Sequence, residues 1–374
     1  MDTKLEKTLS GKSLLGDQHW PWGYPNWVEK EEIPVKVKPF SLSINTLINK
    51  QPITQQVHPT QNTPIEKLTC QDISLICCCG DSLLTGLGVT SNPSKLKNKI
   101  LSAMVKMNFS LMVPWLISGE HRHNTCITGG GNGVVSAGRL LNSVLNGRLQ
   151  GLSFKKTVLF SKGNGFNFAR TGAQSSNLIN QIHTLISNVR KQGVMKEYKL
   201  LFIWIGANDI ITKSTSYIRI HFENHLVHCL TILKQCVPKL VVCILPIPHF
   251  STLLMGNKLN LEKKQRIDQK TLLVNKILYN VVHEFSWNSN DFKVIWQPIP
   301  VDPINQDMLH IQNDQPLFIS TLDNVHPSFI AQQLFAKCIW NNLFRGKDEK
   351  LENIHDVVNS EWHHPTETDR ICFE

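Results

Sequence analysis

The sequence predicts an α/β fold in which a mostly parallel sheet is covered by helices on both faces. Apolar runs alternate along the chain with stretches of helical periodicity, which is the pattern of strand–helix–strand units joined by right-handed crossovers. The apolar runs are continuous rather than alternating, as expected for strands that are buried on both faces. The length of 374 residues allows one large α/β domain or two ordinary ones.

Five apolar runs are candidate strands. Each is short and is bounded by polar residues, glycine or proline, which indicates a buried strand rather than a helix. The clear runs are Asp72–Cys79, which ends at Gly80, and residues 199–206, 239–246 and 292–298; a weaker run covers Phe166–Ala169.

Helical patterns occur between these runs. Apolar residues recur with helical spacing over 178–189 and 222–233, so each stretch is expected to pack one apolar stripe on the core. Pro327 is expected in the first turn of a last apolar helix that continues through Phe344, because proline is well tolerated there. The stripes consist of Leu178, Ile182, Leu185, Ile186 and Val189, and of Phe222, Leu226, Leu230 and Leu233.

The flanks differ from the centre in composition. Residues 1–65 have no helical or strand period and predict an irregular N-terminal arm, residues 66–346 predict the α/β domain, and residues 347–374 predict a polar tail. The first residues have no apolar core of signal-peptide length, and no apolar stretch is long enough to span a membrane.

The net charge of +10 favours anionic surfaces, but the basic residues are scattered and no nucleic-acid-binding motif occurs. We therefore expect no nucleic-acid partner. The ten cysteines form no C-x-x-C pair. Cys77, Cys78 and Cys79 are consecutive in a strand, so neighbours point to opposite faces and are expected to be small buried hydrophobes. We expect no metal and no cofactor.

Polar motifs follow the predicted strands, where active sites of parallel sheets lie. They are Gly80-Asp81-Ser82-Leu83, the stretch 167–173, and Gly206-Ala207-Asn208-Asp209; a fourth, Asp323-Asn324-Val325-His326, precedes the last helix. A serine hydroxyl needs a base to accept its proton, and a histidine such as His326 titrates near neutrality. Asp323 lies three residues earlier, close enough to orient the imidazole. The side-chain amide of Asn208 and the backbone N–H of Gly172 are candidate donors to an oxyanion.

In these four blocks the sequence resembles the SGNH, or GDSL, hydrolases, and within them the animal membrane-associated phospholipase B branch. The matching stretches include ICCCGDSLLTGLGV, GFNFARTGAQSSNL, LFIWIGANDI and DNVHPSFIAQQLFAKCIWNNLF, and the resemblance covers about 65 to 345. It implies a flavodoxin-like three-layer sandwich with a mostly parallel five-stranded sheet. It also implies Ser82 as nucleophile, His326 as base, Asp323 as orienter, and Ser82, Gly172 and Asn208 as the oxyanion hole.

Each motif also has a structural interpretation. Ser82 after an aspartate is compatible with a helix cap, Asn208 and Asp209 with a turn, Gly172 with a turn glycine, and Asp323 with a cap of the last helix. Two further stretches attract attention. Glu120-His121-Arg122-His123 resembles a metal cluster but is expected to be a solvated loop. GGGNG at 129–133 lacks the Lys-Ser/Thr of a phosphate loop and is expected to be a flexible wall near the site.

The sequence departs from the resembled family in a few places. It has GDSLL where GDSLT is usual and GAND where GGND is usual, and the paired cysteines that often follow the latter block are replaced by ITKSTSY. The resemblance implies a secreted or membrane-associated protein, whereas the sequence shows no signal peptide; we therefore expect either an intracellular chain or one whose first exon is absent from the sequence, and favour the second.

The leading hypothesis is a phospholipase B-type serine esterase that hydrolyses phospholipids and lysophospholipids through an acyl-serine intermediate, at a membrane surface. The alternatives are a GDSL esterase acting on a non-phospholipid ester, and a non-catalytic binding protein with the same fold. Head-group preference and oligomeric state are left open by the sequence.

Overall fold

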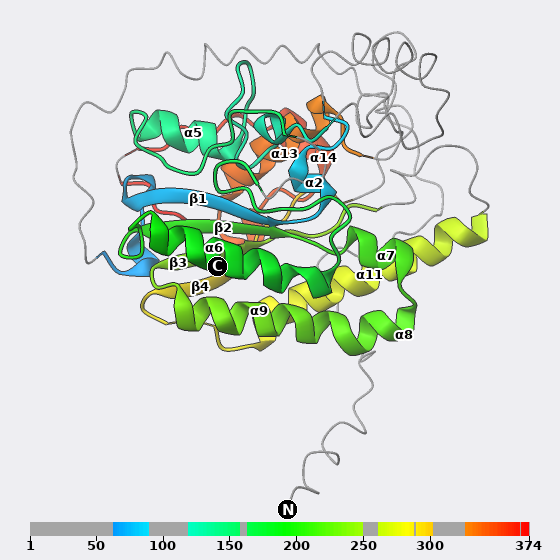
Figure 1. Cartoon of the computed structure of the whole chain (residues 1–374). Coiled ribbons are helices and arrows are strands. Elements are labelled where there is room, and N and C mark those ends of the chain that lie inside the picture. The colour runs from blue at the N-terminus through cyan, green and yellow to red at the C-terminus, as the bar shows by residue number, and fades with distance from the viewer. Residues whose placement is uncertain are drawn as a thin grey trace, which may run out of the picture. The chain divides into compact units, whose positions relative to one another are not determined.

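In the computed structural model the described residues are 63–89, 119–157, 163–249, 261–287, 289–301, 326–366 and 368–373. Within them lies one sheet of four parallel strands in the order β1-β2-β3-β4, so each strand pairs with its neighbour in sequence (Figure 1). The strands are β1 (Ile73–Gly80), β2 (Tyr198–Trp204), β3 (Leu240–Ile244) and β4 (Phe292–Trp296).

Helices cover both faces of this sheet, so the α/β class that the sequence predicts is confirmed (Figure 1). One layer consists of α6 (Leu178–Lys191), α9 (Glu223–Cys236) and α11 (Leu261–Glu284); the other contains α5 (Ala137–Val144), α13 (Phe329–Asn342) and α14 (Ile354–Asn359). Shorter helices are α2 (Ser82–Thr85), α7 (Ala207–Thr212) and α8 (Thr215–Tyr217), with a π-helical turn at Ile218–Phe222 and 3-10 turns at Ile65–Lys67, Cys70–Asp72, Arg122–Asn124, Ser175–Asn177 and Lys347–Glu349.

The core lies between the sheet and the helix layers. Every residue of β2 and β3 is buried, and so are both predicted apolar stripes, which lie on α6 and on the π-turn with α9. Even Lys199 in β2 is buried, because its ammonium donates to the carbonyl oxygens of Val194 at 3.1 Å and Met195 at 3.0 Å. Cys77, Cys78 and Cys79 have no exposed surface, and burial raises the pKa of each thiol, which confirms them as small buried residues.

The expected fifth strand is wrong as a strand, although its residues take the expected place. Phe168 donates its N–H to Cys78 O at 2.9 Å, and Cys78 donates to Phe166 O at 3.0 Å, so the segment runs parallel beside β1. The pairing is limited to an isolated bridge between Cys78 and Asn167. Gly163 and Gly165 before it have φ angles of 135° and 61°, which take the backbone out of the extended conformation.

Two predictions about the C-terminal part also change. The last helix, α13, starts at Phe329, so Pro327 lies before its first turn. Ser328 caps the helix, because its hydroxyl accepts the Ala331 N–H at 3.1 Å. The predicted polar tail is packed rather than loose in its described residues, because its apolar side chains are buried and Cys372 donates its N–H to Leu343 O at 2.7 Å. The buried side chains are Leu351, Ile354, Val357, Ile371 and Phe373.

Candidate active site

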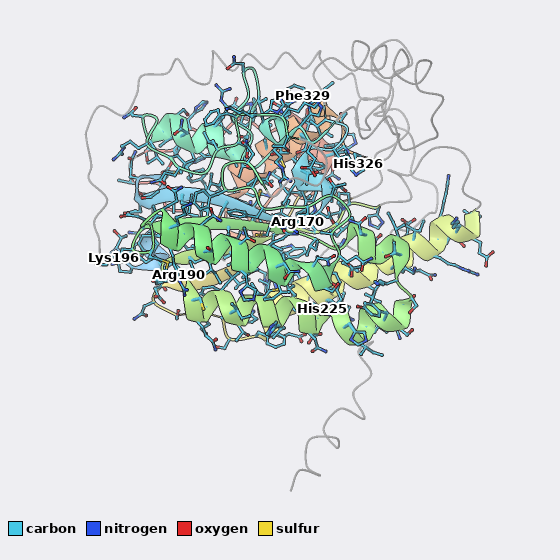
Figure 2. The ribbon with its side chains drawn as sticks, in the orientation of Figure 1. Arg170, Arg190, Lys196, His225, His326 and Phe329 are labelled. Carbon is cyan, nitrogen blue, oxygen red and sulfur yellow. The ribbon has the colours of Figure 1, made fainter. Side chains whose placement is uncertain are left out.

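Ser82 and His326 meet at the carboxyl end of β1. Ser82 is the first residue of α2, His326 lies just before α13, and His326 Nε2 is 2.8 Å from Ser82 Oγ. Figure 2 shows His326 beside α2. Both residues are more than nine-tenths buried. When Nε2 is the unprotonated nitrogen it accepts the serine proton, which is the geometry required for general-base activation of a nucleophile.

The chain turns sharply from β1 into α2 at Gly80. Its φ is 157°, and a Cβ at this position would overlap the carbonyl oxygen of Trp204 on β2. The side chain of Gln181 on α6 binds both backbone polar groups of Gly80, since it accepts the Gly80 N–H at 2.7 Å and donates to Gly80 O at 2.8 Å. The glycine and the glutamine therefore fix the place where Ser82 leaves the sheet.

Asp81 caps the nucleophile helix and also reaches the next strand end. One carboxylate oxygen accepts the Leu83 N–H at 3.0 Å, and the other accepts the Ala207 N–H at 3.3 Å. Burial raises the pKa of Asp81 to about 7, against the opposing effects of these N–H donors and of His326. The sequence analysis missed this residue. Its signal was an Asp directly before a helix that follows a strand.

The candidate oxyanion donors lie on two loops that are tied together. Asn208 donates its side-chain amide to Ala173 O at 2.9 Å, which leaves the second amide hydrogen for a ligand. Gly172 is exposed, its φ is 79°, and a Cβ there would meet no atom within 4 Å. Its N–H, like that of Ser82, has no acceptor among the described residues. Among the described residues these two backbone N–H groups and one amide hydrogen therefore have no acceptor, and both loops bond to the turn before Ser82, through Arg170 N–H to Gly80 O and Ala207 N–H to Asp81.

A second group of polar residues supports the Asn208 loop. Asp209 is buried and accepts two hydrogen bonds from Ser175, from its N–H at 2.8 Å and from its hydroxyl at 2.7 Å. His225 Nδ1 on α9 lies 3.0 Å from the same hydroxyl. Residues Ala207–Asp209 begin helix α7, so they form more than the simple turn considered from the sequence. The sequence analysis did not identify Ser175 or His225.

The Glu120–His123 stretch is not the solvated loop that was expected. Glu120 and Arg122 are wholly buried and form an ion pair with 2.7 Å between Oε2 and Nη2. In the part of the chain that the structure describes, no three His, Cys, Asp or Glu side chains gather as a metal site. Asp323 lies outside the described residues.

The glycines at 129–131 form a hydrogen-bonded, buried turn rather than an open wall. Gly129 donates its N–H to Thr125 O at 3.2 Å, and Gly131 donates to His123 O at 2.9 Å. These amides are therefore occupied, and a phosphate would find no free N–H cradle at either glycine.

A parallel α/β sheet with a serine–histidine pair at its carboxyl edge defines the class: an ester hydrolase. The chain belongs to the GDSL-like lipase/acylhydrolase family, whose model matches residues 76–339.

Curated relatives agree with this family. The chain is 23% identical over 328 residues to mouse membrane-associated phospholipase B1, covering 78% of this chain and 20% of the relative. It is 22% identical over 312 residues to the human protein of the same name, covering 75% and 19%. The chain spans about a fifth of the length of the curated relatives that it matches.

Two solved structures align with more than two thirds of this chain at low identity. An extracellular lipase from Streptomyces rimosus has a TM-score of 0.38 and 15% identity, covering 69% of this chain and 94% of that one. Phospholipase A1 from Streptomyces albidoflavus NA297 has a TM-score of 0.37 and 13% identity, covering 71% and 96%. Among the described residues, no helix combines the length and the apolar character needed to cross a membrane.

Proposed function

We propose that this ester hydrolase is a phospholipase B-type enzyme that removes acyl chains from phospholipids and lysophospholipids. The observation that carries the proposal is the 2.8 Å contact between Ser82 Oγ and His326 Nε2. The similarity to mouse and human membrane-associated phospholipase B1 supports the phospholipid substrate.

The proposed reaction begins with Ser82. His326 takes the hydroxyl proton at Nε2 while Oγ forms a bond to the ester carbonyl carbon. The carbonyl oxygen becomes an oxyanion, which accepts hydrogen bonds from the Ser82 and Gly172 N–H groups and the Asn208 amide. When the intermediate collapses, the ester C–O bond breaks, and the proton on Nε2 passes to the departing alcohol. An acyl-serine remains.

The second half of the reaction repeats these roles with water. His326 takes a proton from a water molecule, the hydroxide attacks the acyl-serine, and the fatty acid leaves as Ser82 regains its proton. We assign to Asp323 the role of holding the imidazole in the tautomer that leaves Nε2 free. We also propose that the substrate is presented at a membrane surface.

The test combines active-site labelling with a substrate panel. Wild-type protein and Ser82→Ala are treated with a fluorophosphonate probe, and acyl release is then measured from lysophosphatidylcholine and from a neutral monoacylglycerol of the same chain length. Labelling and release from the lysophospholipid that both vanish in Ser82→Ala support the proposal. Labelling with turnover of the neutral ester alone would instead indicate a non-phospholipid esterase. A folded sample that takes no label would indicate a binding protein.

A further inference from the structure

A buried ion pair is hydrogen-bonded to the 167–173 loop, which carries the candidate oxyanion donor Gly172. The proposed reaction does not use this pair. Glu120 and Arg122 have no exposed side-chain surface. Arg122 contacts the same carboxylate oxygen twice, from Nη2 at 2.7 Å and from Nε at 3.2 Å. Burying two charges costs free energy that is offset only when hydrogen bonds satisfy the remaining polar atoms. The other partners of the pair therefore indicate what it holds in place.

Arg122 extends the pair to the nucleophile helix. Its Nη1 donates to Asn167 twice, to the side-chain oxygen at 2.8 Å and to the backbone oxygen at 3.1 Å. Asn167 in turn donates its side-chain amide to Leu84 O on α2 at 2.7 Å. Three residues later, Arg170 donates its N–H to Gly80 O at 3.0 Å, and Figure 2 labels its position. The start of the 167–173 loop is thus fixed relative to Ser82.

Glu120 reaches the far end of the same loop. Its second oxygen, Oε1, accepts the hydroxyl proton of Thr171 at 2.8 Å. Because that proton points to Glu120, Thr171 Oγ1 is an acceptor for Thr85 Oγ1 on α2, 2.9 Å away. Thr171 directly precedes Gly172, so the same side chain anchors the peptide unit that carries the Gly172 N–H. The Gly172 N–H itself has no acceptor among the described residues.

We infer that Glu120 is a positioning residue for the oxyanion hole, acting through the Thr171 hydroxyl on the Gly172 N–H. The inference rests on the proposed function of Gly172. Gly172 is exposed and has no side chain of its own, and a Cβ built there would meet no atom within 4 Å, so the direction of its N–H depends on the residues beside it. The buried carboxylate supplies that constraint from one residue away. An oxyanion donor is effective only when it is held in place before the charge develops.

The test removes the hydroxyl and keeps the shape of the side chain. Thr171→Val lacks the donor to Glu120, Thr171→Ser retains it, and Thr184→Val is the matched control, because Thr184 on α6 bonds only within its own helix, to Asn180 O. For each variant we would measure kcat and KM on a soluble p-nitrophenyl ester, the inhibition constant of a trifluoromethyl ketone, which forms an oxyanion adduct with serine, and the melting temperature.

The expected result separates positioning from folding. Thr171→Val should lower kcat about 10- to 100-fold with KM within about twofold, less than the 10²–10³ typical of losing a donor outright. The trifluoromethyl ketone should bind more weakly by a similar factor. Thr171→Ser should recover most of the rate, and Thr184→Val should match the wild type.

Two outcomes would overturn the inference. One is a kcat of Thr171→Val within twofold of wild type. The other is a fall in kcat that leaves the ketone inhibition constant unchanged, or that Thr171→Ser does not rescue. Fluorophosphonate labelling of Ser82 keeps the two proposals apart. If wild-type Ser82 takes no label, the proposed function fails. If it labels and Thr171→Val behaves as wild type, only the role of Glu120 fails.

Discussion

Asp81 accepts the backbone N–H of Ala207 across 3.3 Å, and this bond joins the loop before the nucleophile to the loop that carries Asn208. The two loops follow different strands and are more than a hundred residues apart in sequence. A single buried carboxylate therefore sets the distance between the serine that would attack an ester and one of the groups that would stabilise the resulting charge.

Replacing Asp81 should slow the reaction. In Asp81→Asn one carboxylate oxygen becomes an NH₂ group, which cannot accept a hydrogen bond, so only one of the two bonds, from the Leu83 N–H or from the Ala207 N–H, can remain. We expect kcat on a soluble ester to fall by about tenfold or more, since misplacing a positioned group by about 1 Å can cost as much as 10²-fold. Steady-state kinetics would test this, and an unchanged kcat would show that the Asp81 carboxylate is not needed to place Asn208.

Asp81 should also make stability depend on pH. Burial raises its pKa in the folded protein from the ordinary value of 3.8 to about 7, so the folded state binds the proton more tightly than the unfolded state. The contribution is fully present below about pH 4 and is lost as the pH rises toward 7. Urea unfolding at pH 5 and pH 8 should show wild type losing stability relative to Asp81→Asn, by up to a few kcal/mol. Parallel curves for the two proteins would contradict the raised pKa.

Ser82→Ala should abolish ester hydrolysis while leaving the fold intact. Loss of a serine nucleophile typically costs about 10⁴-fold or more in kcat. The control is Ser143→Ala, because the Ser143 hydroxyl is exposed on α5 and bonds only to Leu140 O. Both variants should melt close to wild type, and only Ser82→Ala should lose acyl release. Residual activity above a few per cent would point to another nucleophile.

Asn208→Ala should reduce kcat by about 10²–10³ without eliminating it, because two backbone donors remain for the oxyanion. It also leaves Ala173 O without its donor, so a modest fall in melting temperature is expected. Asn188→Ala on α6 is the comparison, since Asn188 makes a similar amide contact, to Thr184 O at 2.8 Å. Equal activities in the two variants would remove Asn208 from the oxyanion hole.

Comparing Gly172→Ala with Gly193→Ala separates the effect of a side chain on substrate access from the effect of backbone strain. Gly172 and Gly193 have φ angles of 79° and 72°, and at both positions a Cβ would meet no protein atom within 4 Å. Each substitution should therefore cost about 1–2 kcal/mol of stability from the left-handed backbone alone. Only Gly172→Ala should also reduce kcat/KM, because Gly172 is the proposed oxyanion donor and a methyl group there would obstruct the substrate. Activity loss in both would assign the effect to strain.

Local sequence patterns determined much of what the structure shows. Continuous apolar runs placed β1 to β4, because a strand buried on both faces is apolar at successive positions. Helical spacing from Leu178 to Val189 placed α6, because a helix that buries one stripe repeats its apolar residues with the helical period. The blocks around Ser82 and Asn208 were found because each follows a predicted strand, and the block around His326 because it directly precedes the last predicted helix. The roles of Ser82, Asp323 and His326 in catalysis, and of Ser82, Gly172 and Asn208 in the oxyanion hole, remain predictions.

Only the tertiary structure decided which polar residues are buried and what they hold. Glu120 and Arg122 have the composition of a solvated loop, yet they pair in the interior, where Asn167 accepts from Arg122 and Thr171 donates to Glu120 from 45 and 51 residues along the chain. Residues 347–373 look polar, but their few apolar side chains pack on the domain. A charged or polar residue is stable in the interior only when its partners are present, and those partners are brought together by the fold rather than by neighbouring sequence.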